Sequence, residues 1–90
     1  MTMAAAELLK ELSKDDRLNR IAISDTGFIF DPQTGQSFTL NRTGLVTLSI
    51  LKRGSSIDET AEQLSHQYGI TEETAVNSVE AFLLQLGRYL

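Results

Sequence analysis

Residues Ser37 to Gly54 read SFTLNRTGLVTLSILKRG, and this stretch decides the fold. Phe38 and Leu40 alternate with polar residues, which predicts a strand with one buried face. Asn41 follows directly, and its side-chain oxygen is of the kind that caps the first free amides of a helix. No later strand pattern is present to pair with the far side of this strand. We therefore predict an open strand edge held beside a helix, where another chain can add as an extra strand.

The composition is that of one small globular domain. The 90 residues include 41% hydrophobic and 22% charged residues, which is typical of soluble domains. No Cys is present, so a disulfide framework and a thiolate metal site are excluded. Residues 1–12 lack a signal-peptide pattern, and no apolar run has the length of a membrane span. We expect a cytoplasmic protein with no membrane partner, and the formal net charge of -4 argues against nucleic acid as a partner.

The N-terminal residues predict a short helix over Ala4–Ser13, because Ala, Leu, Glu and Lys favour helices. Its apolar stripe consists of leucines at helical spacing: Leu8, Leu9 and Leu12. A helix of this length is marginal in isolation, so it docks on the domain, docks on a partner or frays. The polar run Lys14-Asp15-Asp16-Arg17 predicts a solvated connector. We accordingly divide the chain into an arm with its connector, residues 1–19, and a recognition domain, residues 20–90.

Short strands are predicted next, at Arg20–Ser24, Phe28–Phe30 and Gln36–Leu40. The turn signals Asp25-Thr26-Gly27 and Asp31-Pro32-Gln33-Thr34-Gly35 separate them. This arrangement predicts an antiparallel meander with one buried face, which helices must cover. The apolar residues assigned to that face are Ile21, Ile23, Phe28, Phe30, Phe38 and Leu40.

The rest of the chain predicts helices with clear start and stop signals. The first covers Arg42–Arg53, and the second begins with the capping box Ser56-Ile57-Asp58-Glu59 and ends at Gly69. The third begins at Thr71 and ends at Gly87. The predicted fold class is therefore α+β: a three-stranded antiparallel sheet followed by three helices, with an extra N-terminal helical arm. This is the inventory of a winged helix-turn-helix.

Residue types that carry out chemistry are sparse in this chain. His66 is the only His, and a lone His without Cys cannot form the usual transition-metal sites. The neighbouring carboxylates of Asp15-Asp16 and of Glu72-Glu73 point in different directions on a helix, so neither pair predicts an acid/base dyad. The glycines are scattered and form no phosphate-binding loop. We predict no catalytic residue, no metal site and no cofactor, and we expect His66 at the surface.

The third predicted helix bears on the DNA-binding alternative. In a winged helix-turn-helix the last helix of the trihelical unit enters the major groove. Here that helix carries Glu72, Glu73 and Glu80 and no Lys or Arg, so phosphates repel it. A DNA-binding regulator therefore remains the weaker alternative. A structural dimerisation module is another, in which the N-terminal leucines or the open edge pair with a second copy.

The same helix has more apolar residues than one packing face needs. Ala75, Val79, Phe82 and Leu86 lie in the middle of its apolar arc, and Leu84 points nearly away from the arc. Two further residues fall to one side, and two interpretations of them stay open. They pack against the preceding helices, or they line a groove shared with the edge strand. These residues are Val76 and Leu83.

The order and spacing of these elements resemble the PqqD family of small peptide chaperones, over roughly Ile21 to Leu90. The matching features are Leu40-Asn41-x-Thr43-Gly44, Gly54 before a capped helix, Leu64-x3-Tyr68-Gly69-Ile70 and Val79-x2-Phe82-Leu83-x2-Leu86. The family often has an acidic residue before the valine of the last helix. Here Ser78 precedes Val79, so a role for that carboxylate does not carry over.

The resemblance implies a winged helix-turn-helix-like domain that binds a precursor peptide instead of DNA. The leader segment of the peptide would lie as a fourth strand between the third strand and the third helix. The domain would then present it to a modifying enzyme, often of the radical SAM class. We predict peptide-binding residues along the edge strand and on the third helix. They are Gln36, Ser37, Phe38, Thr39, Leu40, Asn41, Val76, Val79, Glu80 and Leu83.

Overall fold

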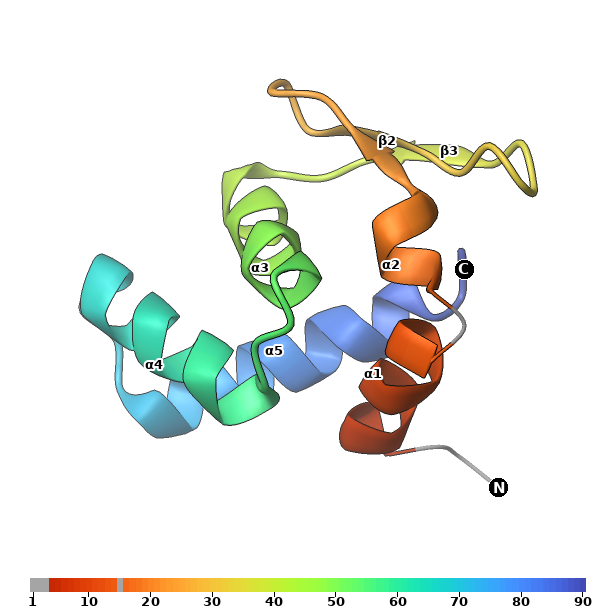
Figure 1. Cartoon of the computed structure of the whole chain (residues 1–90). Helices are drawn as coiled ribbons and strands as arrows, with labels where there is room; N and C mark the ends of the chain where they lie inside the picture. Colours follow the sequence, from red (N-terminus) through yellow and green to blue (C-terminus); the bar gives the residue numbers. More distant parts are fainter. Residues whose placement is uncertain (1–3, 15) are drawn as a thin grey trace.

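The computed structural model describes residues 4–14 and 16–90. Along these residues the elements follow each other in the order shown in Figure 1. They are α1 (Ala5–Lys14), α2 (Arg17–Arg20), β1 (Ala22–Ile23), β2 (Phe28–Phe30), β3 (Ser37–Thr39), α3 (Arg42–Lys52), α4 (Ile57–Tyr68) and α5 (Glu72–Leu86). The predicted α+β class, a three-stranded antiparallel sheet followed by helices, is confirmed. Every described helix is too short or too polar to span a bilayer.

The helix ends follow the local signals of the sequence. Asn41 caps α3 by accepting a hydrogen bond from the Gly44 amide at 2.8 Å. At the start of α4 the Ser56 hydroxyl accepts from the Glu59 amide, and the Glu59 carboxylate accepts from the Ser56 amide. Gly69 ends α4 with φ of 66°, a left-handed conformation that favours glycine. The predicted caps are confirmed because each depends only on residues a few positions apart.

One short helix was absent from the prediction. The run expected to be a solvated connector continues into α2, which buries Leu18 (3% exposed) beneath the sheet. Asp15, which belongs to the predicted connector, lies outside the described residues, as do residues 1–3 of the predicted arm. The Arg17 guanidinium donates to the carbonyl of Leu90 at 2.9 Å. Residues near the two ends of the chain are therefore joined directly.

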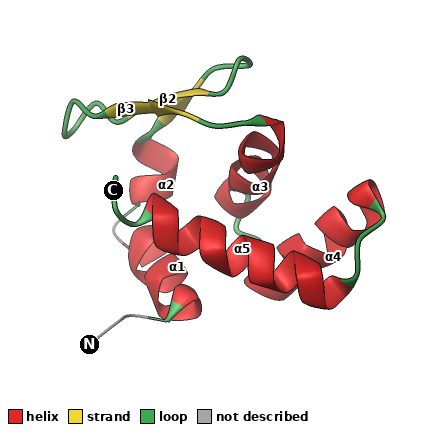
Figure 2. Cartoon of the chain, turned by 180° about the vertical axis from the view of Figure 1, so that it is seen from behind, coloured by secondary structure: helices red, strands yellow, loops and turns green. Residues whose placement is uncertain are grey.

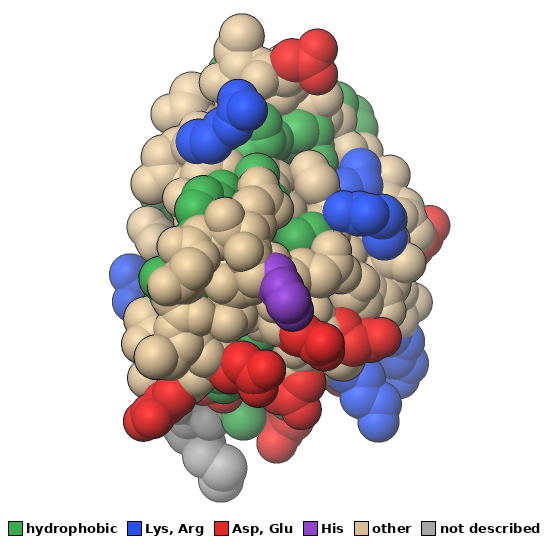
Figure 3. Space-filling model, turned by 90° about the vertical axis from the view of Figure 1, so that its left-hand side faces the viewer, with side chains coloured by type: hydrophobic (Ala, Val, Ile, Leu, Met, Phe, Trp, Pro, Cys, Tyr) green, Lys and Arg blue, Asp and Glu red, His purple; other side chains and the backbone are tan. Residues whose placement is uncertain are grey.

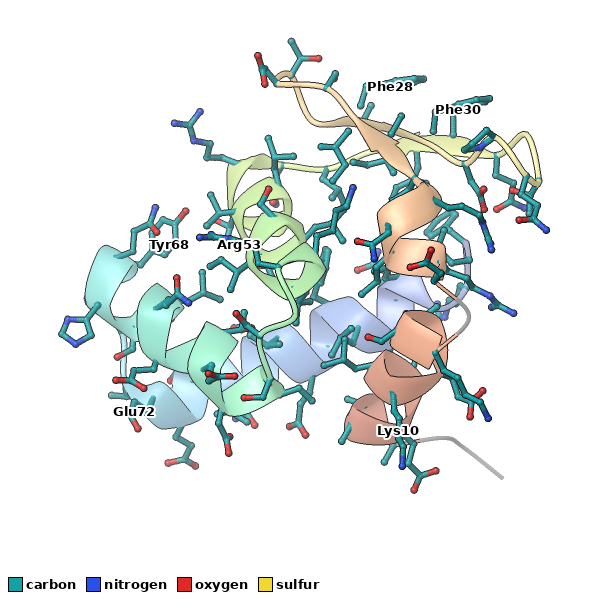
Figure 4. The ribbon with its side chains drawn as sticks, in the orientation of Figure 1. Lys10, Phe28, Phe30, Arg53, Tyr68 and Glu72 are labelled. Carbon is teal, nitrogen blue, oxygen red and sulfur yellow. The ribbon has the colours of Figure 1, made fainter. Side chains whose placement is uncertain are left out.

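The sheet has the order β1-β2-β3, and its register decides which face is buried. Ile29 pairs with both Ile23 and Phe38, and these side chains face the helices, with Ile29 fully buried. The prediction that Phe28 and Phe30 share the buried face is wrong: they are 46% and 39% exposed. Figure 4 shows both rings pointing away from the helices. All three residues of β2 are apolar, so alternation alone does not select the buried face.

Helix α5 is the centre of the core. Figure 2 shows it running from α4 at one end to the region beneath the sheet at the other. One cluster of buried residues joins α5 to α1, α3 and α4: Ala5, Ile50, Leu51, Ala61, Leu64, Ala75, Val79 and Leu83. A second lies under the sheet: Leu12, Leu18, Ile21, Ile29, Leu48 and Leu86. Of the alternatives for the N-terminal helix, docking on the domain is therefore the one observed.

The contact of α1 with the end of α5 is close. A methyl group on Gly87 would lie 2.7 Å from the Leu8 Cδ2 atom, so only glycine allows Leu8 its present position. Leu8 and Leu9 are half-buried and pack against the core clusters, and Leu12 is fully buried. The leucine stripe predicted from the sequence is thus the face by which α1 joins the domain.

Candidate functional site

The outer edge of β3 presents main-chain hydrogen-bonding groups. The Leu40 amide donates to the Gly27 carbonyl at 2.8 Å, and the Asp31 amide donates to the Gln36 carbonyl at 2.9 Å. In an antiparallel pair every second residue points its amide and carbonyl toward the partner strand. The intervening residues, Ser37 and Thr39, therefore point theirs away from β2. Among the described residues no strand lies on that side of β3.

A cleft of about 230 Å³ opens between this strand and the C-terminal part of α5. The chain running out of β3 supplies one wall, consisting of Phe38, Thr39, Leu40 and Asn41, and Gly44 adds to it from α3. The opposite wall consists of Phe82, Gln85, Leu86 and Tyr89. The cleft is thus continuous with the open edge, because Thr39 belongs to both.

Tyr89 and Phe38 join the two walls at one end of the cleft. Their rings are stacked, with centroids 4.7 Å apart and planes 23° from parallel. Tyr89 is held by hydrogen bonds in the turn after α5, where its amide donates to the Leu86 carbonyl at 3.0 Å. Its ring remains 42% exposed. A side chain that enters the cleft therefore meets an aromatic surface whose position is fixed from both sides.

The cleft is electrically neutral. None of the described residues that line it is an Asp, Glu, Lys, Arg or His, and its polar side-chain groups are the hydroxyls of Thr39 and Tyr89 and the amides of Asn41 and Gln85. The Asn41 side-chain oxygen is already occupied by the Gly44 amide. The described part of the chain also holds no group of three or more His, Asp or Glu placed to bind a metal ion. Uncharged walls with both apolar and polar groups, beside open main-chain groups, are suited to binding an extended peptide segment.

The structure brings together only part of the predicted site. Phe38, Thr39, Leu40 and Asn41 line the cleft, and Ser37 continues along the open edge. Gln36 precedes β3 and uses its carbonyl in the contact with Asp31. For all six residues from Gln36 to Asn41, a role in peptide binding stays a prediction.

The predicted residues of α5 do not line the cleft. Val79 and Leu83 are fully buried in the core cluster, and Val76 packs against it. The interpretation that Val76 and Leu83 face the edge strand is wrong, and packing against the other helices is the correct alternative. The strand approaches α5 from the side of Phe82 and Leu86, which lie about 60° to 120° around the helix from Val76 and Leu83. Glu80 borders a different hollow.

The predicted site left out five residues that line the cleft: Gly44, Phe82, Gln85, Leu86 and Tyr89. Phe82 and Leu86 had been assigned to the packing face of the helix, and Gln85 and Tyr89 had been given no role. Helical spacing from Phe82 gives Gln85, Leu86 and Tyr89 at i+3, i+4 and i+7, which is one face of a helix. The prediction stopped at Gly87 because glycine commonly ends a helix. Hydrogen bonds in fact continue the helical turn to Leu90, whose amide donates to the Leu86 carbonyl. Extending the spacing past Gly87 would have placed Tyr89 on the same helix face as Phe82 and Gln85, but it would not have shown that the sheet approaches that face.

A family model described as Coenzyme PQQ synthesis protein D (PqqD) matches residues 27–89. The matched range begins at the turn before β2 and includes β3, α5 and every residue that lines the cleft. No curated protein and no solved structure matches the chain.

Proposed function

The chain belongs to the PqqD family, and on that premise we propose that it is a non-catalytic chaperone for a ribosomally made precursor peptide. Membership in a family that acts in coenzyme PQQ synthesis supports a peptide-binding role for this chain. In the proposal, the leader segment of the precursor adds as a fourth strand to β3. The domain then presents the peptide to a modifying enzyme, for example one of the radical SAM class.

The observation that carries the proposal is the outward direction of the main-chain groups of Ser37 and Thr39 beside the cleft. An added strand can donate to and accept from these groups without regard to its side chains, so they supply affinity that tolerates sequence differences. Because side chains alternate along a strand, every second residue of the peptide would point into the cleft. Selectivity would then depend on the fit of those residues.

The walls indicate which side chains fit. Phe38, Phe82, Leu86 and Tyr89 offer apolar and aromatic surface, so an apolar leader residue is favoured and a charged one is disfavoured by the loss of its hydration. Arg42 is exposed at the start of α3, next to the Asn41 end of the cleft. It can pair with an acidic leader residue that lies just outside the cleft. Such a rim pair would contribute modestly because water screens it.

The test begins with a search of the neighbouring reading frames for a short precursor peptide. The isotope-labelled chain is then titrated with a synthetic peptide of its leader segment. We expect amide chemical-shift changes along Gln36–Asn41 and from Phe82 to Tyr89. Changes confined to α1 or to α4 would overturn the assignment. A Thr39→Pro variant, which removes the outward amide, should bind about tenfold more weakly or worse, whereas Thr39→Val keeps the amide and should stay within about twofold.

A further inference from the structure

A second hollow lies on another face of α5 and shares no residue with the cleft. It has a volume of about 400 Å³ and is formed where α1, the start of α4 and the middle of α5 meet. Val76 and Glu80, which the sequence singled out but the cleft does not use, both line it. We call this hollow the acidic groove, and the residues that matter for its chemistry are Ala6, Leu9, Ile57, Asp58, Val76 and Glu80.

The acidic groove has an apolar floor and a charged rim. Leu9, Ile57 and Val76 are half-buried and pack on the core cluster, so their outer surfaces are fixed in position. Asp58 is exposed, and Glu80 is half-buried on α5. A ligand that suits this surface combines an apolar side chain for the floor with positive charge for the two carboxylates.

The part of the chain that supplies α4 and α5 is strongly acidic. The segment from Ile57 to Leu86 contains six acidic residues and no Lys or Arg, a formal charge of -6. Since the whole chain carries -4, the remainder carries +2. Figure 3, which views the α4 end, shows carboxylate side chains gathered along the lower part of that face near His66. Lys10, on the neighbouring helix α1, is the basic residue next to Leu9 and partly offsets this field.

We propose that the acidic groove docks a basic amphipathic segment of a partner protein. An apolar side chain of that segment contacts Leu9, Ile57 and Val76, while its Lys or Arg residues pair with Asp58 and Glu80. The complementary charges steer the encounter, and the apolar contact gives the complex its lifetime. The inference rests on the proposed function in one respect: a domain that presents a peptide needs a second surface for the enzyme. Because the two hollows share no lining residue, both can be occupied together.

The probe for the test is a synthetic amidated helix with leucines at helical spacing and lysines at its other positions. Titrated into the labelled full chain, it should shift the amides of Ala6, Leu9, Ile57, Val76 and Glu80. Binding should weaken as salt is added, because exposed charges are screened. A second probe with glutamate in place of lysine should not bind. Equal binding of the two probes, or shifts at the cleft instead, would overturn the proposal.

Matched variants distinguish binding at the acidic groove from a general attraction to the acidic surface. Glu80→Gln and Glu62→Gln each remove one carboxylate from the acidic segment, but only Glu80 lines the groove. We expect the first to weaken binding of the lysine probe about fivefold, or about 1 kcal/mol, and the second less than about twofold. Equal losses would mean that no groove is involved. Ala6→Lys, at an exposed helix position that tolerates the change, should weaken binding about tenfold.

The two proposals fail separately. Thr39→Pro blocks strand addition far from the groove, so it should leave binding of the lysine probe unchanged. If the leader does not bind the cleft while the lysine probe binds as expected, the proposed function is wrong and the proposal for the acidic groove is supported. If the leader binds and the probe shows no preference for lysine over glutamate, the groove assignment falls alone.

Discussion

The two ends of α5 present opposite chemistry, although they belong to one helix with one apolar arc. At the C-terminal end, Phe82 and Leu86 line a neutral cleft next to an open strand edge. At the N-terminal end, Glu72 and Glu73 occupy the first turn, and no Lys or Arg occurs in the helix. Between them Val79 and Leu83 are fully buried. The difference teaches that the elements packed around each turn of α5, rather than the pattern of the helix itself, decide what that turn does.

The largest expected effect is a loss of stability when a fully buried residue of α5 is substituted. Leu83→Ala removes a side chain that is 0% exposed between α1, α3 and α4, and the cavity should lower the free energy of unfolding by about 3 kcal/mol. Peptide affinity of the folded variant should change little. The neighbouring Leu84→Ala, at a side chain 41% exposed, should cost less than about 1 kcal/mol. Chemical denaturation measures both, and equal losses would contradict the assignment of Leu83 to the core.

The next largest expected effect is the difference in stability loss between substitutions on the two faces of β2. Ile29→Ala should lower the free energy of unfolding by about 2 kcal/mol, less than Leu83→Ala because the thin sheet is covered on one side only. Phe28→Ala, on the outer face, should cost less than about 1 kcal/mol despite removing a larger side chain. Thermal unfolding of the pair decides the point. A larger loss for Phe28→Ala would mean that the register is shifted by one residue.

The C-terminal end should respond in binding rather than in stability. Tyr89→Ala removes the aromatic surface stacked on Phe38, so leader affinity should fall about tenfold. Since the ring is 42% exposed, stability should change by less than about 1 kcal/mol. Tyr68→Ala is the matched control, because that tyrosine is 40% exposed but lies at the end of α4, away from the cleft. Calorimetric titration that finds the same affinity for both variants would rule out Tyr89 as part of the binding wall.

The contrast between the ends also shows what the sequence can predict. The caps at Asn41, Ser56 and Thr71 depend on hydrogen bonds within one turn, so they were predictable from neighbouring residues. The open edge of β3 was predictable as well, because the order of strands left it without a partner. Gln85 and Tyr89 were missed because their role depends on which side of α5 the sheet approaches, a tertiary contact that helical spacing does not encode.

The prediction of which face of β2 is buried was wrong for a related reason. In the run Phe28-Ile29-Phe30 each residue is apolar, so period-2 alternation fits either face equally well. Size favours burying the two phenylalanines, but pairing with Ile23 and Phe38 places Ile29 inward. The turn that Gly35 closes with φ of 78° fixes that pairing. Where local pattern is ambiguous, the connection between strands decides.

The smallest effect is electrostatic and belongs to the acidic end. Hydrogen bonds from the Ser56 amide and from the Ser56 side chain hold the pKa of the Glu59 carboxyl below its ordinary value of 4.5. A lowered pKa in the folded state means that ionised Glu59 stabilises the fold fully above about pH 4.5 and loses this contribution as the pH falls through the folded-state pKa.

Glu59→Gln isolates this contribution, because glutamine also completes a capping box but does not titrate in this range. The difference in unfolding free energy between the parent chain and the variant should therefore shrink as the pH is lowered from about 7 to about 3. At each pH the parent chain and the variant should bind the leader equally well, since Glu59 is not among the residues that line the cleft. A stability difference that stays constant with pH would show that the carboxylate at this cap is not preferentially stabilised in its ionised form.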